Sequence, residues 1–290
     1  MIALARNLRS LLALLAVLVW FVPCGFAVRL LVLPAARLWP RKRPALISVY
    51  MKVVTWGIFA LLRAGGARIR RTGSVPTEKA VLVIMNHQSL LDIQQMTMMA
   101  QPFVPAFVTR ARYARFIPLI SPSIRLLGCP IIDPGRNRRD ALEVIREKAA
   151  ELEHGLLIFP EGHRTRDGEI QPFHTAGLRA ILALRPLPVY LAVTDGFWQA
   201  RRFVDVLFNI HRIDGRTEIL GPFPSPADEA AIPEFLEQAR ERMIARLREM
   251  RGAGVAPPEG QPALGRSPRH APRRGKRGRL RSSPFPKQGG

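Results

Sequence analysis

Short apolar runs alternate with segments of helical period between Lys79 and Phe223. An apolar run bounded by polar or turn-forming residues is typical of a buried strand, and helical segments between such runs favour a largely parallel sheet. We therefore predict a single α/β domain in which helices flank a largely parallel mixed sheet. The segments that we expect to form strands are 80–85, 103–108, 130–133, 156–159, 187–193, 204–210 and 217–220.

Two segments of this region have the pattern of amphipathic helices. Residues 138–152 place apolar side chains on one side and charges on the other, and Gly155 follows the end of the pattern. Residues 226–250 open at Ser225 or Asp228 and are heavily charged. We expect the first helix to be structural and most of the charge of the second to form a solvated face.

Residues 1–62 are much more apolar and predict helices that associate with a membrane. No charged residue occurs from 10 to 28, and a helix of that length, at about 1.5 Å per residue, could just cross a hydrocarbon core of roughly 30 Å. Pro23 and Gly25 are expected to kink it. A second apolar stretch, 45–62, is interrupted only by Lys52. Two interpretations are open: a spanning helix, or two helices that dip into one leaflet around the basic connector 41–43.

Basic residues are in excess after the first apolar stretch. Arg6 and Arg9 precede the stretch, and the basic residues that follow it are Arg29, Arg37, Arg41, Lys42 and Arg43. Because positively charged flanks remain on the cytoplasmic side, we expect the following domain to face the cytoplasm. A cleaved signal peptide is disfavoured, since no convincing small-x-small cleavage site follows.

The net charge of +22 predicts attraction to polyanions, either nucleic acid or an anionic bilayer surface. Residues 252–290 are rich in Pro, Gly and Arg, and they cannot bury enough apolar surface to offset the entropy of ordering. We therefore predict membrane-anchoring helices over 1–62, a catalytic domain over 63–251 and a disordered basic tail over 252–290. The two cysteines, Cys24 and Cys129, imply no disulfide framework, and no Cys/His spacing of zinc-binding type occurs.

His87 and Asp92 are the first candidates for catalysis. They follow the apolar run 80–85, where a strand is expected to turn into a helix. An imidazole can remove a proton from a hydroxyl group, and a carboxylate that accepts its other ring N–H stabilises the imidazolium that forms. Ser89 and Asp92 also fit a helix capping box, in which Asp92 only closes the first turn. Both interpretations are open for Asp92.

A second cluster, Phe159-Pro160-Glu161-Gly162-His163-Arg164, follows the apolar run that ends at Ile158. With Asn86-His87-Gln88-Ser89-Leu90-Leu91-Asp92 and Gly128-Cys129-Pro130-Ile131-Ile132-Asp133, it resembles the sequence blocks of the glycerolipid acyltransferases of the 1-acylglycerol-3-phosphate acyltransferase type. The family's blocks are NHxSxxD, G-x-(I/V)-(F/P)-(I/V)-(D/K)-R and FPEGTR, and the three matching segments occur here in the same order. A fourth block matches weakly, because Ala192 stands where the family usually has proline.

The resemblance implies a role for each matching residue. His87 would be the general base and Asp92 its orienting partner, while Asn86 and the backbone N–H groups after His87 would be donors to the oxyanion. Glu161, Gly162 and Arg164 would form the acceptor pocket, with Arg136 as a secondary anion-binding residue. No G-x-S-x-G elbow occurs, so a covalent acyl-enzyme is disfavoured, and neither a metal nor a cofactor is expected.

Three departures from the family blocks concern the acceptor. Pro134 replaces an arginine, His163 replaces threonine or serine, and His174 stands where a basic residue is common. We therefore predict acyl transfer from acyl-CoA or acyl-carrier protein to a lysophospholipid, with 1-acylglycerol-3-phosphate as the leading acceptor and another lyso-lipid as the alternative. A non-catalytic protein that binds anionic lipid or nucleic acid is a further hypothesis. The tail has Phe285 as its only aromatic residue for base stacking, so we expect membrane lipids and no specific nucleic acid as partners.

Overall fold

The structure is a computed structural model and describes residues 2–115, 117, 119–133, 137–202, 205–206 and 210–252. They fall within one compact unit, Met1–Gly254. Its centre is a six-stranded sheet in the order β1–β10–β9–β3–β8–β5. The strands are β1 (Arg68–Thr72), β10 (Asp214–Phe223), β9 (Val189–Asp195), β3 (Val81–Met85), β8 (Gly155–Ile158) and β5 (Ala106–Phe107).

Four of these strands, β9, β3, β8 and β5, run parallel, whereas β10 is antiparallel to β9 and β1 pairs in parallel with β10. The predicted α/β class with a largely parallel mixed sheet is therefore confirmed. Two short two-stranded sheets pair β2 (Val75–Pro76) with β4 (Ala100–Gln101) and β6 (Thr109–Arg110) with β7 (Ile131–Ile132).

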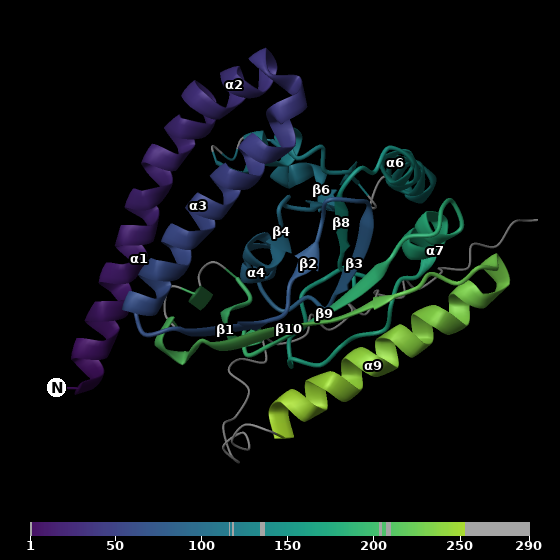
Figure 1. Cartoon of the computed structure of the whole chain (residues 1–290). Coiled ribbons are helices and arrows are strands. Elements are labelled where there is room, and N and C mark those ends of the chain that lie inside the picture. Colours follow the sequence, from purple (N-terminus) through teal and green to yellow (C-terminus); the bar gives the residue numbers. More distant parts are fainter. Residues whose placement is uncertain are drawn as a thin grey trace, which may run out of the picture. The chain divides into compact units, whose positions relative to one another are not determined.

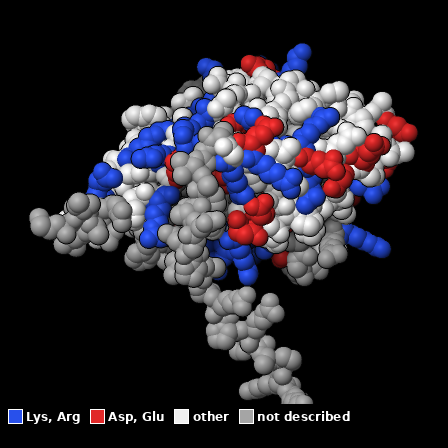
Figure 2. All heavy atoms as spheres, turned by 90° about the horizontal axis from the view of Figure 1, so that it is seen from below, with Lys and Arg blue, Asp and Glu red and all other residues white. Residues whose placement is uncertain are grey.

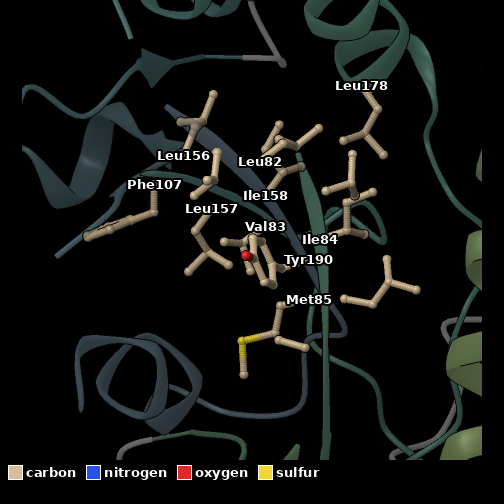
Figure 3. Close-up of a cluster of buried hydrophobic side chains, with 14 of the residues drawn as sticks. Leu82, Val83, Ile84, Met85, Phe107, Leu156, Leu157, Ile158, Leu178 and Tyr190 are labelled. Atoms are coloured by element: carbon tan, nitrogen blue, oxygen red, sulfur yellow. The ribbon is translucent and has the colours of Figure 1, made fainter. Parts of the chain in front are cut away.

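The central strands are buried on both faces because helices cover both sides of the sheet. On one side lie α6 (Arg138–Ala150), α7 (Ala176–Leu182) and α9 (Ile232–Gly252), and on the other α4 (Leu91–Met99) and α3 (Arg43–Ala64) (Figure 1). Every residue of β3 is buried, as expected for a strand covered on both faces. Figure 3 shows the apolar side chains that β3 and β8 contribute to this core, including Leu82, Ile84 and Leu156.

Two features of the strand prediction were wrong. Residues 204–210 do not form the expected strand in their described part, because residues 205–206 are helical and Ile210–Arg212 is a 3-10 turn. The edge strand β1 was not expected, because its sequence Arg-Ile-Arg-Arg-Thr contains a single apolar side chain, Ile69, which is buried. β1 forms by pairing with β10, which is longer than predicted.

The helix predictions require smaller changes. α6 begins where it was expected, with the Asn137 side chain accepting a hydrogen bond from the Arg139 backbone N–H. α9 begins at Ile232, later than predicted, because Asp228 caps a separate 3-10 turn, Glu229–Ala231. On the lower side of Figure 1, where α9 lies, basic and acidic side chains are interspersed (Figure 2).

The N-terminal region forms a helical hairpin. α1 (Ile2–Ala27) continues through Pro23, and the irregularity lies farther along, in the π-helical segment Val28–Val32 that precedes α2 (Leu33–Leu38). Pro34 has no N–H to continue the α-helical pattern, which accounts for the change of helix type before it. The helix is unbroken at Pro23 and Gly25, and the kink expected there stays a prediction. After the 3-10 turn Pro40–Lys42, α3 returns alongside α1 (Figure 1).

One side of the hairpin packs on the α/β domain, whereas another side is exposed and apolar. From α3, Ile47, Phe59 and Leu62 are each only 1% exposed. Both arms are long and apolar enough to cross a membrane by length and composition alone. The large apolar side chains that the hairpin leaves exposed include Leu11, Leu15, Val19, Val22, Phe26 and Trp56.

Candidate active site

Three parallel strands bring the segments that carry the candidate site residues to one edge of the sheet. β3 ends before His87, β8 ends before the loop that contains Glu161, and β9 ends at Asp195. Because these strands run in the same direction, their carboxyl ends meet, which is the usual place for a ligand site in an α/β sheet. Segments separated by more than seventy residues are thereby joined.

His87 and Asp92 form a hydrogen-bonded pair at this edge. His87 Nδ1 lies 2.8 Å from Asp92 Oδ2, and the imidazole stacks on the ring of Phe159 with centroids 4.1 Å apart. The Asp92 side chain is fully buried, whereas 18% of the His87 side chain is exposed. A carboxylate can only accept, so Nδ1–H donates to Asp92 and Nε2 retains a free electron pair for a proton.

The same Asp92 oxygen also closes the turn that follows β3. Oδ2 accepts the backbone N–H groups of Gln88 and Ser89 at 2.6 and 2.8 Å. Asp92 is therefore both the capping residue of this turn and the partner of His87, so the two alternatives left open by the sequence occur together. This arrangement uses the Gln88 and Ser89 amides, which consequently do not serve as the expected oxyanion donors.

Asn86 has a role different from the one expected. Its side-chain amide donates to the Thr194 carbonyl at 2.9 Å, and its Oδ1 accepts the Thr194 backbone N–H at 2.8 Å. With 1% of its surface exposed, Asn86 ties the end of β3 to β9. Its expected function as an oxyanion donor does not fit this geometry, and we assign it the positioning of His87.

Glu161 likewise faces the protein and not an open acceptor pocket. Its Oε1 accepts the His87 backbone N–H at 2.9 Å, and its Oε2 accepts the Gln171 backbone N–H at 3.1 Å. Burial raises the pKa of Glu161 to about 7, although these two N–H donors act in the opposite direction. The carboxyl group joins the loop after β8 to the loop after β3, so it positions His87.

Gly162 and Arg164 remain beside the open part of the site. Gly162 has a φ of +67°, and the Arg110 guanidinium donates to its carbonyl at 3.2 Å. The positive φ favours glycine here, and a Cβ at this position would also crowd the His174 ring, since it would lie 3.1 Å from its Cδ2. Arg164 is half-buried, and its guanidinium donates to the Arg201 carbonyl at 2.5 Å.

A cluster of arginines beside Arg164 was not found from the sequence. The pKa of Arg201 is lowered by burial and by the positive charges of Arg202, Arg166 and Arg164. Mutual repulsion of this kind indicates a positive potential suited to an anionic group. Arg136, the secondary anion-binding candidate, lies outside the described residues.

Gln88 and Arg251 form a second group that the sequence did not suggest. The Gln88 amide donates to the Gly168 carbonyl and to Asp195, while its Oε1 accepts the Phe197 backbone N–H. Arg251, at the end of α9, donates to Asp195 and to the same Gly168 carbonyl. The last helix is thereby linked to the residue next to His87. Only tertiary contacts reveal this link.

The described residues contain no group of three or more His, Cys, Asp or Glu side chains placed to hold a metal ion. Cys129 is buried, and burial raises its pKa to about 12, which makes this thiol a poor nucleophile. The chemistry available at the sheet edge is therefore that of the His87–Asp92 pair beside a positive cluster.

Comparison with known proteins identifies this arrangement. A family model described as Acyltransferase matches residues 67–193, which contain His87, Asp92 and the loop with Glu161 and Arg164. Residues 67–193 are therefore similar to the acyltransferase family. The described structure is similar to the crystal structure of the 1-acyl-sn-glycerophosphate (LPA) acyltransferase, PlsC, from Thermotoga maritima, with a TM-score of 0.67 and 20% identity. The match covers 87% of this chain and 100% of that chain.

The acyltransferase fold predicted from the sequence blocks is thus confirmed, as is the assignment to an acyltransferase enzyme. No curated protein matches the sequence. At 20% identity the structural likeness concerns the fold, so the acceptor of this acyltransferase has to be argued from its own residues.

Proposed function

We propose that this acyltransferase moves a fatty acyl group from a thioester, acyl-CoA or acyl-carrier protein, to the hydroxyl group of a lysophospholipid. The leading acceptor is 1-acylglycerol-3-phosphate, with phosphatidic acid as the product. The observation that carries the proposal is the His87–Asp92 pair, held at 2.8 Å at the carboxyl end of β3 with the imidazole partly exposed. The enzyme class requires such a base for the attacking hydroxyl group.

The proposed reaction proceeds without an acyl-enzyme. His87 Nε2 removes the proton of the acceptor hydroxyl while its oxygen forms a bond to the thioester carbonyl carbon. Asp92, which accepts the Nδ1–H, stabilises the imidazolium. The tetrahedral oxyanion then collapses, the carbon–sulfur bond breaks, and the imidazolium returns the proton to the leaving thiolate. The products are an ester and a free thiol, and His87 is again neutral.

The arginine cluster supports an anionic acceptor. The Arg164 guanidinium donates a hydrogen bond to the backbone carbonyl of Arg201, which keeps these two residues next to each other. Because an arginine fork matches the geometry of a phosphate group, we assign the acceptor phosphate to this cluster. Glu161 and Gly162 contribute by shaping the loop that presents Arg164 and by positioning His87.

The acceptor is tested by a panel assay with the purified full-length chain. With an acyl-CoA or acyl-carrier protein donor, thiol release is measured with lysophosphatidate, lysophosphatidylglycerol and an amino-acid-containing lyso-lipid. We expect lysophosphatidate to be used best and Arg164→Gln to raise KM for it more than it lowers kcat. Preference for an amino-acid-containing lyso-lipid without a phosphate group would refute the phosphate assignment, and no transfer to any acceptor, beside an active control enzyme, would refute the function.

For the hairpin, we propose insertion into one leaflet with the catalytic domain on the cytoplasmic side. Support comes from α3, which packs on the catalytic domain through Ile47, Phe59 and Leu62 and therefore cannot be surrounded by lipid. The exposed apolar side of α1 supplies the lipid contact, since burying each large apolar side chain contributes about 1.5–3 kcal/mol.

The double variant Leu15→Gln/Val19→Gln tests this placement. Both residues lie on the exposed apolar side of α1, where they are 47% and 68% exposed. We expect the variant to bind phosphatidylcholine vesicles at least about tenfold more weakly. The control, Leu184→Gln, alters a side chain that is 46% exposed and lies outside the hairpin, and it should bind like the wild type. Release of the wild type by high salt alone would contradict an apolar anchor.

A further inference from the structure

A cavity of about 840 Å³ lies between the hairpin and the segment around α5 (Ile120–Leu126). Five arginines line it: Arg29 from the π-helical segment, Arg37 from α2, Arg43 from the start of α3, Arg115, and Arg125 from α5. The lining includes neither His87 nor Asp92, Glu161 or Arg164. The cavity is therefore a second site with its own set of residues.

Backbone carbonyls hold two of the cavity arginines in place. Arg43 donates to the Leu126 and Arg125 carbonyls at 2.7 and 2.8 Å, and Arg125 donates to the Ala114 carbonyl at 3.1 Å. No acidic residue is among those that line the cavity. Within the described part of the chain, no ion pair joins any of the five arginines to a carboxylate. Five like charges around one space repel one another, and an anion in that space would offset the repulsion.

The rest of the lining is apolar, which limits the kind of anion. Leu33, Ile117 and Leu126 are among the lining residues. On the outside, the turns that carry Arg29 and Arg37 also expose Leu30 and Trp39, which are 66% and 55% exposed. A ligand suited to both surroundings has a phosphate group at one end and a hydrocarbon chain at the other.

We propose that this cavity binds a phospholipid, with its phosphate group among the arginines and its acyl chain along the apolar lining. Guanidinium forks recognise phosphate oxygens through paired, charge-assisted hydrogen bonds. The position of the cavity beside the exposed apolar hairpin places it where a membrane phospholipid can enter it. The bound lipid is not acylated there, since His87 is not part of the lining. It would instead hold the enzyme at the level of the lipid phosphates.

The experiment uses the full-length chain and the variant Arg37→Gln/Arg115→Gln. Arg37 belongs to α2 and Arg115 to the segment before α5, so they line the cavity from different elements, and both are exposed. Binding is measured to phosphatidylcholine vesicles with and without phosphatidate. The wild type should prefer the vesicles with phosphatidate, and the variant should lose at least about tenfold of that preference while still binding phosphatidylcholine through the hairpin.

The matched control is Arg41→Gln/Lys42→Gln, which removes the same charge from exposed residues of the hairpin connector that do not line the cavity. It should keep the preference for phosphatidate. An equal loss in the control would show general surface attraction and overturn the proposal. Competition by coenzyme A or inorganic phosphate, equal to that of phosphatidate vesicles, would also overturn the lipid assignment.

Two further measurements make the outcome independent of folding and of the proposed function. Arg37→Gln alone, on the outer arm of the hairpin, repeats the test if the double variant does not fold, and it should show a smaller loss in the same direction. Acyl transfer to a water-soluble, short-chain acceptor should be unchanged in the double variant. A chain without any transferase activity would still show the phosphatidate preference if the cavity binds lipid.

Discussion

Asp92→Asn separates the negative charge of this side chain from its shape. In the structure a single oxygen, Oδ2, accepts the Gln88 and Ser89 backbone N–H groups at 2.6 and 2.8 Å and the His87 ring N–H at 2.8 Å. Asparagine can place its one oxygen at the same point and accept the same donors, but it is neutral. The substitution therefore keeps the turn and removes the charge that balances the imidazolium.

The expected magnitudes differ for catalysis and for stability. Turnover should fall by roughly 10²–10⁴-fold, the range for loss of effective general-base catalysis. The free energy of unfolding should fall by about 1–2 kcal/mol, because bonds to a charged acceptor become bonds to a neutral one and the new amide nitrogen is buried. The loss of turnover and the loss of stability have one cause, because the fully buried Asp92 carboxylate both pairs with His87 and caps the turn.

Thiol release from the acyl donor and urea unfolding measure these two effects. Asp167→Asn is the matched control, because Asp167 also caps its loop, accepting from the Thr165 hydroxyl at 2.6 Å and the Glu169 N–H at 3.0 Å. The control should lose stability and keep most of its turnover. The double variant His87→Ala/Asp92→Asn should be little worse than His87→Ala, since the two residues act as one unit. Nearly full turnover in Asp92→Asn would return Asp92 to a purely capping role, and an active His87→Ala would refute the mechanism.

Three other substitutions test the surroundings of the site. Because the pKa of Glu161 is raised to about 7, the native state holds this proton more tightly than the unfolded chain, and the associated stability is present below about pH 4.5 and lost as the pH rises through 7. Urea unfolding measures the free energy of unfolding of Glu161→Gln relative to that of the wild type. As the pH rises from about 5 to about 8, this difference should shift in favour of the variant by roughly 1–3 kcal/mol. A difference that does not change with pH would contradict the raised pKa. Gly162→Ala, at a φ of +67°, should lose about 1–2 kcal/mol of stability, whereas Gly177→Ala, inside α7, should gain up to about 1 kcal/mol; equal effects would refute the conformational argument. Arg251→Gln should lower kcat, because it removes the link to Gln88 through Asp195. Arg248→Gln, on the exposed side of α9, should leave kcat unchanged. A kcat that falls in Arg248→Gln and not in Arg251→Gln would exclude that link.

The sequence by itself determined the class of fold and the pairing of His87 with Asp92. The apolar runs before His87 and before Phe159 became the adjacent strands β3 and β8, because a run buried on both faces has few alternatives to a central strand. His87 and Asp92 are five residues apart, so the turn that joins them is local and could be anticipated. The order of the blocks then led to the acyltransferase family, in agreement with the match over residues 67–193.

The tertiary structure decided what the neighbouring residues do. Asn86 and Glu161 were expected to contact substrate, but they bond to backbone groups 108 and 74 residues away, and such partners have no pattern in the sequence. The same holds for the arginines that gather beside Arg164, and for the five that line the cavity next to α5. A side chain's burial and hydrogen-bond partners depend on segments that meet only after folding. For this reason the sequence could name the residues of the site but could assign a role only to those whose partners are close along the chain.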